Sequence, residues 1–226
     1  MNVLDVKDIS YSYKDGKNKR VILEGINYNF KLGKFYTILG QSGSGKTTFV
    51  SLVAALDQPT SGSVYYNGTD INEIGLINFR KHHVGMIFQD FNLIPYMSAV
   101  QNVTTAMAIS GVKEDKQRAY ELLEEVGINR EVASRKVTTL SGGEKQRVAI
   151  TRALVGDKNI IIGDEPTGNL DATISDSIVD IFIKLAHDHN KCVIVVTHSQ
   201  ELADRSDIQL HLDSYTHQFV EKETSR

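Results

Sequence analysis

The amino-acid sequence predicts an α/β protein with a parallel β-sheet at its core. Short strand patterns with turn signals fill the first third of the chain, and helical periodicity follows residue 110. Near the C-terminus an amphipathic helix lies between two apolar strands. Together these observations predict a strand-rich N-terminal region, a helical insertion from about residue 90 to residue 156, and a parallel core completed by the last third of the chain.

The first third contains four runs with strand character: Val3–Val6, Ile26–Phe30, Phe35–Leu39 and Ser63–Tyr66. They are separated by the turn signals Asp15-Gly16, Leu32-Gly33 and Asn67-Gly68. Pro59, Pro95 and Pro166 all fall in expected loops. No proline therefore needs to interrupt a sheet.

A helix is expected in the middle of the chain, just before Gly127. Its apolar face is formed by Ala119, Leu122, Leu123 and Val126. Gly127 then follows as the residue that ends the helix, because glycine adopts the left-handed conformation common at that position.

The clearest tertiary signal is the strand, helix and strand between residues 159 and 196. The strands are Asn159–Ile162 and Val193–Val196, and both are apolar. The helix between them has an apolar stripe consisting of Ile174, Ile178, Ile181, Phe182 and Leu185. Two strands joined through a helix form a parallel pair with a right-handed crossover.

Composition limits the classes of function. The 226 residues carry 25 Lys and Arg against 28 Asp and Glu, a net charge of −3, so no nucleic-acid partner is expected. The N-terminus lacks the pattern of a signal peptide, and no apolar run approaches the roughly 18 to 20 residues of a membrane span. The single cysteine, Cys192, is expected to be buried in a reducing compartment. We therefore expect a cytoplasmic chain that acts at a membrane only through another protein.

A phosphate-binding loop, or P-loop, is expected between the strand ending at Leu39 and the helix that follows it. The pattern is Gly-x₄-Gly-Lys-Thr, and its glycines let the backbone curve around an anion at a helix N-terminus. Lys46 is expected to reach the β- and γ-phosphates, and Thr47 to coordinate Mg²⁺. A flexible Gly/Ser-rich turn is the alternative, but it does not account for the flanking strand and helix. The helix is expected to bury Phe49, Leu52, Val53 and Leu56. The predicted nucleotide contacts are Gly40, Gln41, Ser42, Gly43, Ser44, Gly45, Lys46, Thr47 and Thr48.

Two carboxylates follow the apolar strand Ile160–Ile162. Asp164 and Glu165 are placed where open α/β sheets bind ligands, at the C-terminal end of a buried strand. Asp164 suits the shell of a Mg²⁺ ion, and Glu165 suits polarisation of an attacking water. A solvated turn before Pro166 is the alternative.

The segment Leu140–Gln146, Leu-Ser-Gly-Gly-Glu-Lys-Gln, resembles the signature motif of ABC-transporter ATPases. Ser141 can cap the helix that follows, and Glu144 occupies the reciprocal capping-box position. Gly142 and Gly143 would leave the first helical amides accessible to a phosphate. Without the resemblance, the same residues would describe only a well-capped surface helix.

The resemblance extends over essentially the whole chain and assigns further residues. Gln89 matches the family's Mg²⁺-sensing glutamine, and Asp171 matches the aspartate of the loop that crosses the dimer interface. His198 matches the switch histidine that contacts the γ-phosphate; by itself it would be read as a satisfied histidine at a strand end. Tyr13 matches the aromatic that stacks on adenine better than Tyr11, because it immediately precedes the turn. A purely structural tyrosine on an edge strand is the alternative for either.

The resemblance implies a single ABC ATP-binding domain, residues 1–226, with the RecA-like fold of P-loop NTPases. A parallel-sheet nucleotide-binding core, residues 1–89 and 157–226, would carry an N-terminal antiparallel β subdomain, and residues 90–156 would form an inserted α-helical subdomain. The implied ligands are ATP and Mg²⁺, the latter held by Thr47, Gln89 and Asp164.

The implied partners are a second copy of the chain and an integral membrane permease. In a head-to-tail homodimer, each ATP would lie between the P-loop of one chain and Ser141–Gly143 of the other. The permease would contact the segment after Gln89, namely Phe91, Leu93, Ile94 and Tyr96. For each of these side chains, covering the local core is the alternative.

The segments Phe88–Pro95 and Pro166–Asp171 especially resemble ATPases of macrolide export, lipoprotein release and bacitracin-type peptide resistance. We therefore expect an ATP-hydrolysing subunit on the inner face of the cell membrane that drives export, extraction or resistance. A cell-division-type ABC ATPase, paired with a membrane protein but not transporting, is the alternative.

Gly163 in place of Ala and Ser199 in place of Asp depart from the family without removing a catalytic group. The histidine pairs 82–83 and 187/189 lack metal-site spacing and are expected on surfaces or loops.

Overall fold

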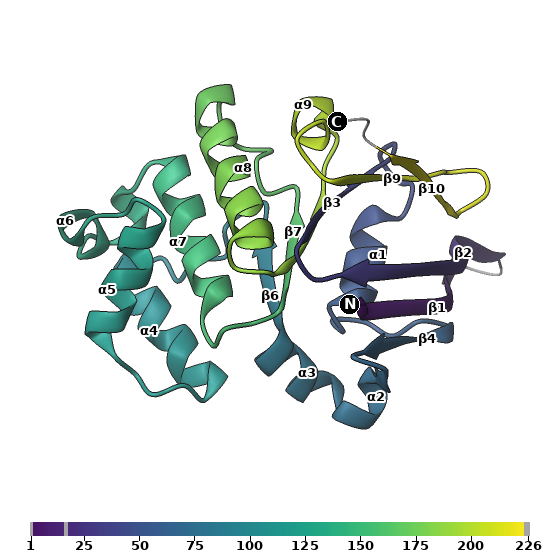
Figure 1. Ribbon diagram of the computed structural model, residues 1–226, viewed down its shortest axis with the longest axis horizontal. Coiled ribbons are helices and arrows are strands. Elements are labelled where there is room, and N and C mark those ends of the chain that lie inside the picture. The colour runs from purple at the N-terminus through teal and green to yellow at the C-terminus, as the bar shows by residue number, and fades with distance from the viewer. Residues whose placement is uncertain (1, 16–17, 224–226) are drawn as a thin grey trace.

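The computed structural model describes residues 2–15 and 18–223, and the described strands form two β-sheets (Figure 1). The first sheet is antiparallel, with the strand order β2-β1-β4-β5. Its strands are β1 Asn2–Asp15, β2 Asn18–Lys31, β4 Ser61–Tyr66 and β5 Thr69–Asp70. The strands β1 and β2 are longer than the sequence patterns predict, and Gly16 of the expected Asp15-Gly16 turn lies outside the described residues.

The second sheet has six strands in the order β10-β9-β3-β8-β7-β6. All neighbours are parallel except β10, which pairs antiparallel with β9. Its strands are β3 Lys34–Leu39, β6 Val84–Phe88, β7 Ile160–Asp164, β8 Cys192–Val196, β9 Ile208–Leu212 and β10 Phe219–Glu223. The predicted parallel pair is confirmed, since β7 and β8 are neighbours joined through helix α8.

Helices surround the parallel sheet, and those between residues 99 and 154 gather at one end of the molecule (Figure 1). The first three are α1 Lys46–Val53, α2 Ile71–Ile74 and α3 Leu76–His83. The group at the end of the molecule is α4 Ala99–Ser110, α5 Lys116–Glu125, α6 Arg130–Ala133, the 3₁₀ helix η1 Val137–Thr139 and α7 Gly142–Leu154. The last two are α8 Ala172–His187 and α9 Gln200–Ala203.

Two helix predictions are confirmed and one is wrong in its extent. Helix α5 lies where the middle helix was expected, and α8 contains the predicted apolar stripe. Helix α1 ends at Val53, so Leu56 lies beyond it and is 49% exposed. The α3 histidines lie in its last turn: His82 is exposed, as expected for a surface position, whereas His83 is partly buried and its ring stacks on Tyr66 with centroids 4.3 Å apart.

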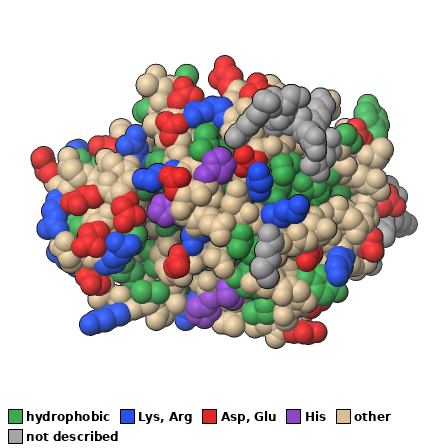
Figure 2. All heavy atoms as spheres, viewed as in Figure 1, with side chains coloured by type: hydrophobic (Ala, Val, Ile, Leu, Met, Phe, Trp, Pro, Cys, Tyr) green, Lys and Arg blue, Asp and Glu red, His purple; other side chains and the backbone are tan. Residues whose placement is uncertain are grey.

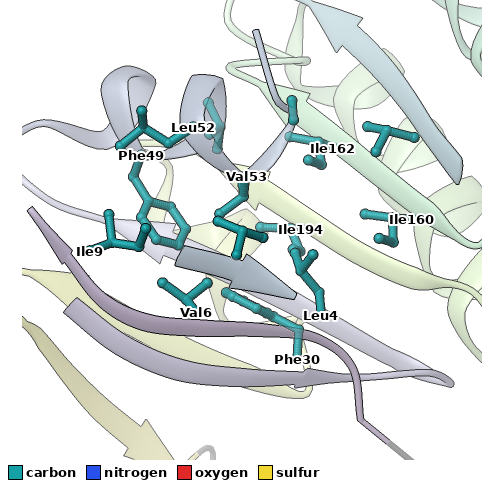
Figure 3. Packing of buried hydrophobic residues seen from close by; sticks show 14 of the residues in the cluster. Leu4, Val6, Ile9, Phe30, Phe49, Leu52, Val53, Ile160, Ile162 and Ile194 are labelled. Atoms are coloured by element: carbon teal, nitrogen blue, oxygen red, sulfur yellow. The ribbon is translucent and has the colours of Figure 1, made fainter. Parts of the chain in front are cut away.

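The core consists of two apolar clusters, one on each face of the parallel sheet. Figure 3 shows the first cluster, in which Leu4 and Phe30 of the antiparallel sheet meet Phe49 of α1 and Ile162 of β7. The second cluster packs the other sheet face against α4, α5, α7 and α8. Because side chains alternate along a strand, Ile160 and Ile162 enter the first cluster and Ile161 the second. Burial of both faces explains why these strands are continuously apolar.

On the face drawn in Figure 2, acidic and basic side chains are interspersed, as the near-balanced composition predicts. Cys192 is fully buried in β8, which confirms the expectation for its side chain, and burial raises the pKa of its thiol. Of the helices in residues 2–15 and 18–223, none is long and apolar enough to cross a bilayer.

Candidate nucleotide site

The P-loop connects β3 to α1, as the motif predicts. Gly45 precedes the helix with a φ of 102°, a conformation that side-chain-bearing residues rarely adopt. A Cβ atom on Gly45 would also lie 2.9 Å from the Cγ2 atom of Ile22. Gly40 is confined differently, because a Cβ there would lie 2.9 Å from the carbonyl oxygen of Leu212. Glycine is therefore required at both ends of the loop for steric reasons.

Lys46 is the first residue of α1, and only 7% of its surface is exposed. Its Nζ atom donates hydrogen bonds to the carbonyl oxygens of Gly40 and Gln41, at 2.8 and 3.0 Å. Burial lowers the pKa of Lys46, and the charges of Glu165 and Asp164 partly oppose that change. The P-loop thus holds a buried ammonium group against its own backbone.

Three neighbouring strands place functional side chains at one edge of the parallel sheet. Phe88 at the end of β6 pairs with Asp164 at the end of β7, and Asp164 pairs with Val196 at the end of β8. The residues that follow, including Gln89 and Glu165, therefore emerge side by side. The Thr47 hydroxyl donates a hydrogen bond to Asp164 Oδ1 at 3.3 Å, which links the P-loop helix to this edge. Burial raises the pKa of Asp164, and the hydrogen bond from Thr47 limits the rise.

Glu165 and His198 form a close pair. The Nδ1 atom of His198 lies 2.9 Å from Oε1 of Glu165. Glu165 is only 9% exposed and has a φ of 48°, an uncommon conformation for a residue with a side chain. Burial raises the pKa of its carboxyl group, while the charges of His198 and Lys46 lower it in part. A carboxylate with a raised pKa beside an imidazole is an arrangement suited to proton transfer.

These side chains open onto one pocket of about 410 Å³. It extends from the β1–β2 hairpin across the P-loop to the Glu165–His198 pair. Its lining residues are Tyr13, Arg20, Ile22, Ser42, Gly43, Gly45, Lys46, Thr47, Thr48, Gln89, Glu165 and His198. A volume of this size is typical of small-molecule sites.

The segment Leu140–Gln146 forms a separate structure at the start of α7. Ser141 caps the helix by accepting a hydrogen bond from the Glu144 amide at 3.3 Å, and Glu144 Oε2 accepts one from the Ser141 amide at 2.7 Å. The predicted capping box is therefore confirmed. Gly143 is buried against α8, where a Cβ would lie 2.7 Å from Cγ2 of Ile174. Close packing of the two helices thus requires glycine at this position.

Comparison with known proteins agrees with this geometry. The family model for ABC transporters matches residues 23–168, which include the P-loop, the Leu140–Gln146 segment and both carboxylates. The chain belongs to the ABC transporter family. It is an ATP-binding subunit with an ATP-hydrolysing domain of the ABC type.

Similar ABC proteins match over nearly the whole chain. An uncharacterized ABC transporter ATP-binding protein of Bacillus subtilis, YclH, is 50% identical over 94% of each chain. The lipoprotein-releasing system ATP-binding protein LolD of Geobacter metallireducens is 39% identical over 89% of this chain and 92% of its own. Among solved structures, the dimeric post-hydrolysis state of the ATP-binding cassette MJ0796, bound to ADP and Pi, has a TM-score of 0.89 at 33% identity. That match covers 99% of both chains.

In this ABC ATPase, most residues predicted to contact ATP line the pocket, but some lie apart. Gly40, Gln41, Ser44 and Asp164 do not line it, although Asp164 is joined to Thr47 by a hydrogen bond. The signature residues Ser141, Gly142, Gly143 and Glu144 and the loop residue Asp171 also lie outside it. Asp171 caps α8 by accepting a hydrogen bond from the Ile174 amide at 3.0 Å.

Two pocket residues were missed by the motifs. Arg20 and Ile22 lie on β2, and Arg20 is directly opposite Tyr13 in the β1–β2 ladder. The available signal was the hairpin register, because a β2 residue across from the predicted Tyr13 shares its face. Tyr11 is positioned differently: its hydroxyl donates a hydrogen bond to Asp57 at 2.7 Å.

The segment after Gln89 has two residues with positive φ values and is hydrogen-bonded to α7. Phe91 and Asn92 have φ values of 61° and 50°, and the guanidinium of Arg152 donates hydrogen bonds to both of their carbonyl oxygens. Leu93 packs against the second cluster, whereas Tyr96 is 73% exposed.

Of the family departures, Ser199 caps α9 by accepting a hydrogen bond from the Leu202 amide at 3.2 Å.

Proposed function

We propose that this chain is the energy-coupling subunit of a membrane transporter and works as an ATP-controlled dimer clamp. The observation that carries the proposal is the division of the motifs between two surfaces. The P-loop, Glu165 and His198 share one pocket, while Ser141 and Gly142 lie outside it. A second copy would supply its signature segment to complete each site, so ATP would join the two chains and hydrolysis would release them.

Within each site, the pocket residues have distinct proposed roles. The P-loop amides from Gln41 to Thr48 and the ammonium of Lys46 bind the phosphates, and Tyr13 stacks on adenine. Glu165 polarises the attacking water, and its raised pKa makes it a stronger base than an exposed carboxylate. His198, 2.9 Å from Glu165, orients that carboxylate and reaches toward the γ-phosphate.

The residues beside the P-loop fit a magnesium ion. Mg²⁺ prefers oxygen ligands and is usually held by one or two protein groups, substrate phosphates and water. The Thr47 hydroxyl and the Asp164 carboxylate, whose oxygens are 3.3 Å apart, offer such a pair, and Gln89 lines the same pocket. When bound, the ion would neutralise charge on the β- and γ-phosphates.

The proposed partners are a second copy of this chain and an integral membrane permease that holds the pair at the inner face of the membrane. The dimeric MJ0796 cassette supports the first, and the lipoprotein-releasing relative LolD supports a role in export or extraction. We propose that residues 90–156 form the helical subdomain and that exposed Tyr96 faces the permease. Purification from detergent-solubilised membranes tests this partner: recovery of DNA or ribosomes in place of a membrane protein would refute it.

Glu165→Gln tests the clamp. The amide cannot accept the water proton, so turnover should fall by about 10² to 10⁴ while ATP binding persists. Blocked hydrolysis should then trap an ATP-bound dimer, seen as a doubling of mass in light scattering. Glu131→Gln on α6, an exposed glutamate outside the pocket, is the matched control and should hydrolyse ATP normally.

A second substitution tests whether the site is shared. In Glu165→Gln/Ser141→Arg, ATP should still bind, but the bulky cation at the signature segment should prevent the mass from doubling. Full hydrolysis by Glu165→Gln, or an ATP-dependent dimer that tolerates Ser141→Arg, would contradict the proposed clamp.

A further inference from the structure

Arg20 is a charged side chain of the nucleotide pocket that none of the motifs includes. It is exposed, and among the side chains that the structure describes no carboxylate forms an ion pair with it. It lies directly across the β1–β2 ladder from Tyr13, and both side chains line the pocket. Directly opposite residues in an antiparallel pair have Cβ atoms roughly 4.5 to 5.5 Å apart on one face. The tyrosine ring and the guanidinium therefore share one wall of the pocket.

Ile22 relates this wall to the P-loop. Its side chain packs on Gly45, the residue that precedes Lys46. Arg20 lies two residues from Ile22 toward the hairpin, at most roughly 6.5 Å along the strand, because the β1–β2 register shifts at Ile22. A nucleotide whose phosphates bind at Gly45 and Lys46 would extend past Ile22, and its base would reach Tyr13 and Arg20.

We propose that Arg20 binds the adenine base together with Tyr13, with the guanidinium of Arg20 against the π face of the adenine ring. This inference rests on the proposed ATP site. Arginine stacks on aromatic rings through cation–π attraction and through its planar shape. The base takes no part in the transfer of the γ-phosphate, so the contact is equal in the ground and transition states. It therefore contributes to affinity and not to the chemical step.

The test separates contacts to the base from contacts to the phosphates. Calorimetry with Mg-ADP and with Mg-tripolyphosphate, which has no base, is compared for wild type, Arg20→Ala, Arg20→Gln and Arg20→Lys. Arg20→Ala and Arg20→Gln should weaken Mg-ADP binding about three- to tenfold, and Arg20→Lys should recover part of the loss. Tripolyphosphate affinity should not change in any of them. In ATP hydrolysis, KM should rise and kcat should stay the same.

Lys7→Ala is the matched control, because Lys7 is an exposed cation of the same sheet whose side chain lies over Tyr65, outside this pocket. It should leave both affinities unchanged. Unchanged ADP binding in Arg20→Ala would overturn the proposal, and so would an equal loss for tripolyphosphate, which would mean that the cation acts on phosphate. Failure of the proposed ATP site is distinguishable from failure of the Arg20 proposal. If the pocket did not bind the phosphates, Lys46→Met would bind Mg-ADP and Mg-tripolyphosphate as tightly as the wild type.

Discussion

The P-loop and the signature segment are both glycine-rich loops that lead into helices, yet they obey different physical rules. The P-loop has Gly43 and Gly45 at positive φ, and α1 begins without a side-chain cap. It also buries the charged group of Lys46. The signature segment begins α7 with a complete capping box, and neither Gly142 nor Gly143 has a positive φ.

This difference indicates what each segment needs from outside the chain. The P-loop backbone and ammonium are arranged at a conformational and desolvation cost, which a phosphate ligand offsets. The signature helix has its side-chain cap without a ligand, since the Ser141 hydroxyl accepts from the Glu144 amide and the Glu144 carboxylate accepts from the Ser141 amide. The structure of the signature segment in a single chain therefore does not indicate its function, which we expect only when a second surface approaches it.

The largest expected effect is the loss of nucleotide binding on removing the P-loop charge. Lys46→Met keeps most of the aliphatic stem but removes the ammonium, so ATP affinity should fall by roughly 10²-fold or more. Stability should not fall. Burial lowers the pKa of Lys46, so the folded state holds this charge at a cost that methionine avoids. Calorimetry and urea unfolding measure the two quantities; a variant that unfolds more easily would show that the ammonium group stabilises the fold.

Sequence patterns predicted the parts of the molecule that depend on local rules. The P-loop, the capping box of Ser141 and Glu144, and the β7–α8–β8 unit each follow from residues close together in the chain. Patterns missed features set by tertiary contacts. Arg20 enters the pocket through hairpin register, Leu56 is exposed because α1 ends early, and Asp171 proves to cap α8 as well as matching a family motif. The roles of Lys46, Thr47, Asp164 and Glu165 followed from the P-loop and strand-end patterns. Those of Gln89 and His198 came from resemblance, because strand ends bring them together from distant segments.

A smaller effect is expected where the signature segment packs on α8. In Gly143→Ala the new Cβ would meet Cγ2 of Ile174 at 2.7 Å, and such overpacking should cost about 1 to 3 kcal/mol of unfolding free energy. Ile174→Ala removes the obstructing methyl. In that background Gly143→Ala should become neutral or stabilising, because alanine favours a helix. A double-mutant cycle by urea unfolding checks this, and additive effects would show that the two residues do not compete for space.

The smallest expected effect is at Ser141. Its substitution should lower the stability of the signature segment and leave ATP binding at the P-loop unchanged. Ser141→Ala removes the hydroxyl that accepts from the Glu144 amide, so unfolding free energy should fall by about 1 kcal/mol, the usual value of an N-cap. ATP binding by the separate chain should not change, because Ser141 does not line the pocket. Ser141→Asp, which preserves a capping oxygen, should restore the stability. Its added negative charge should still weaken the ATP-bound dimer of Glu165→Gln, because that charge would face the phosphates of the partner's nucleotide. If Ser141→Asp left the trapped dimer unchanged, capping would be the whole role of this side chain.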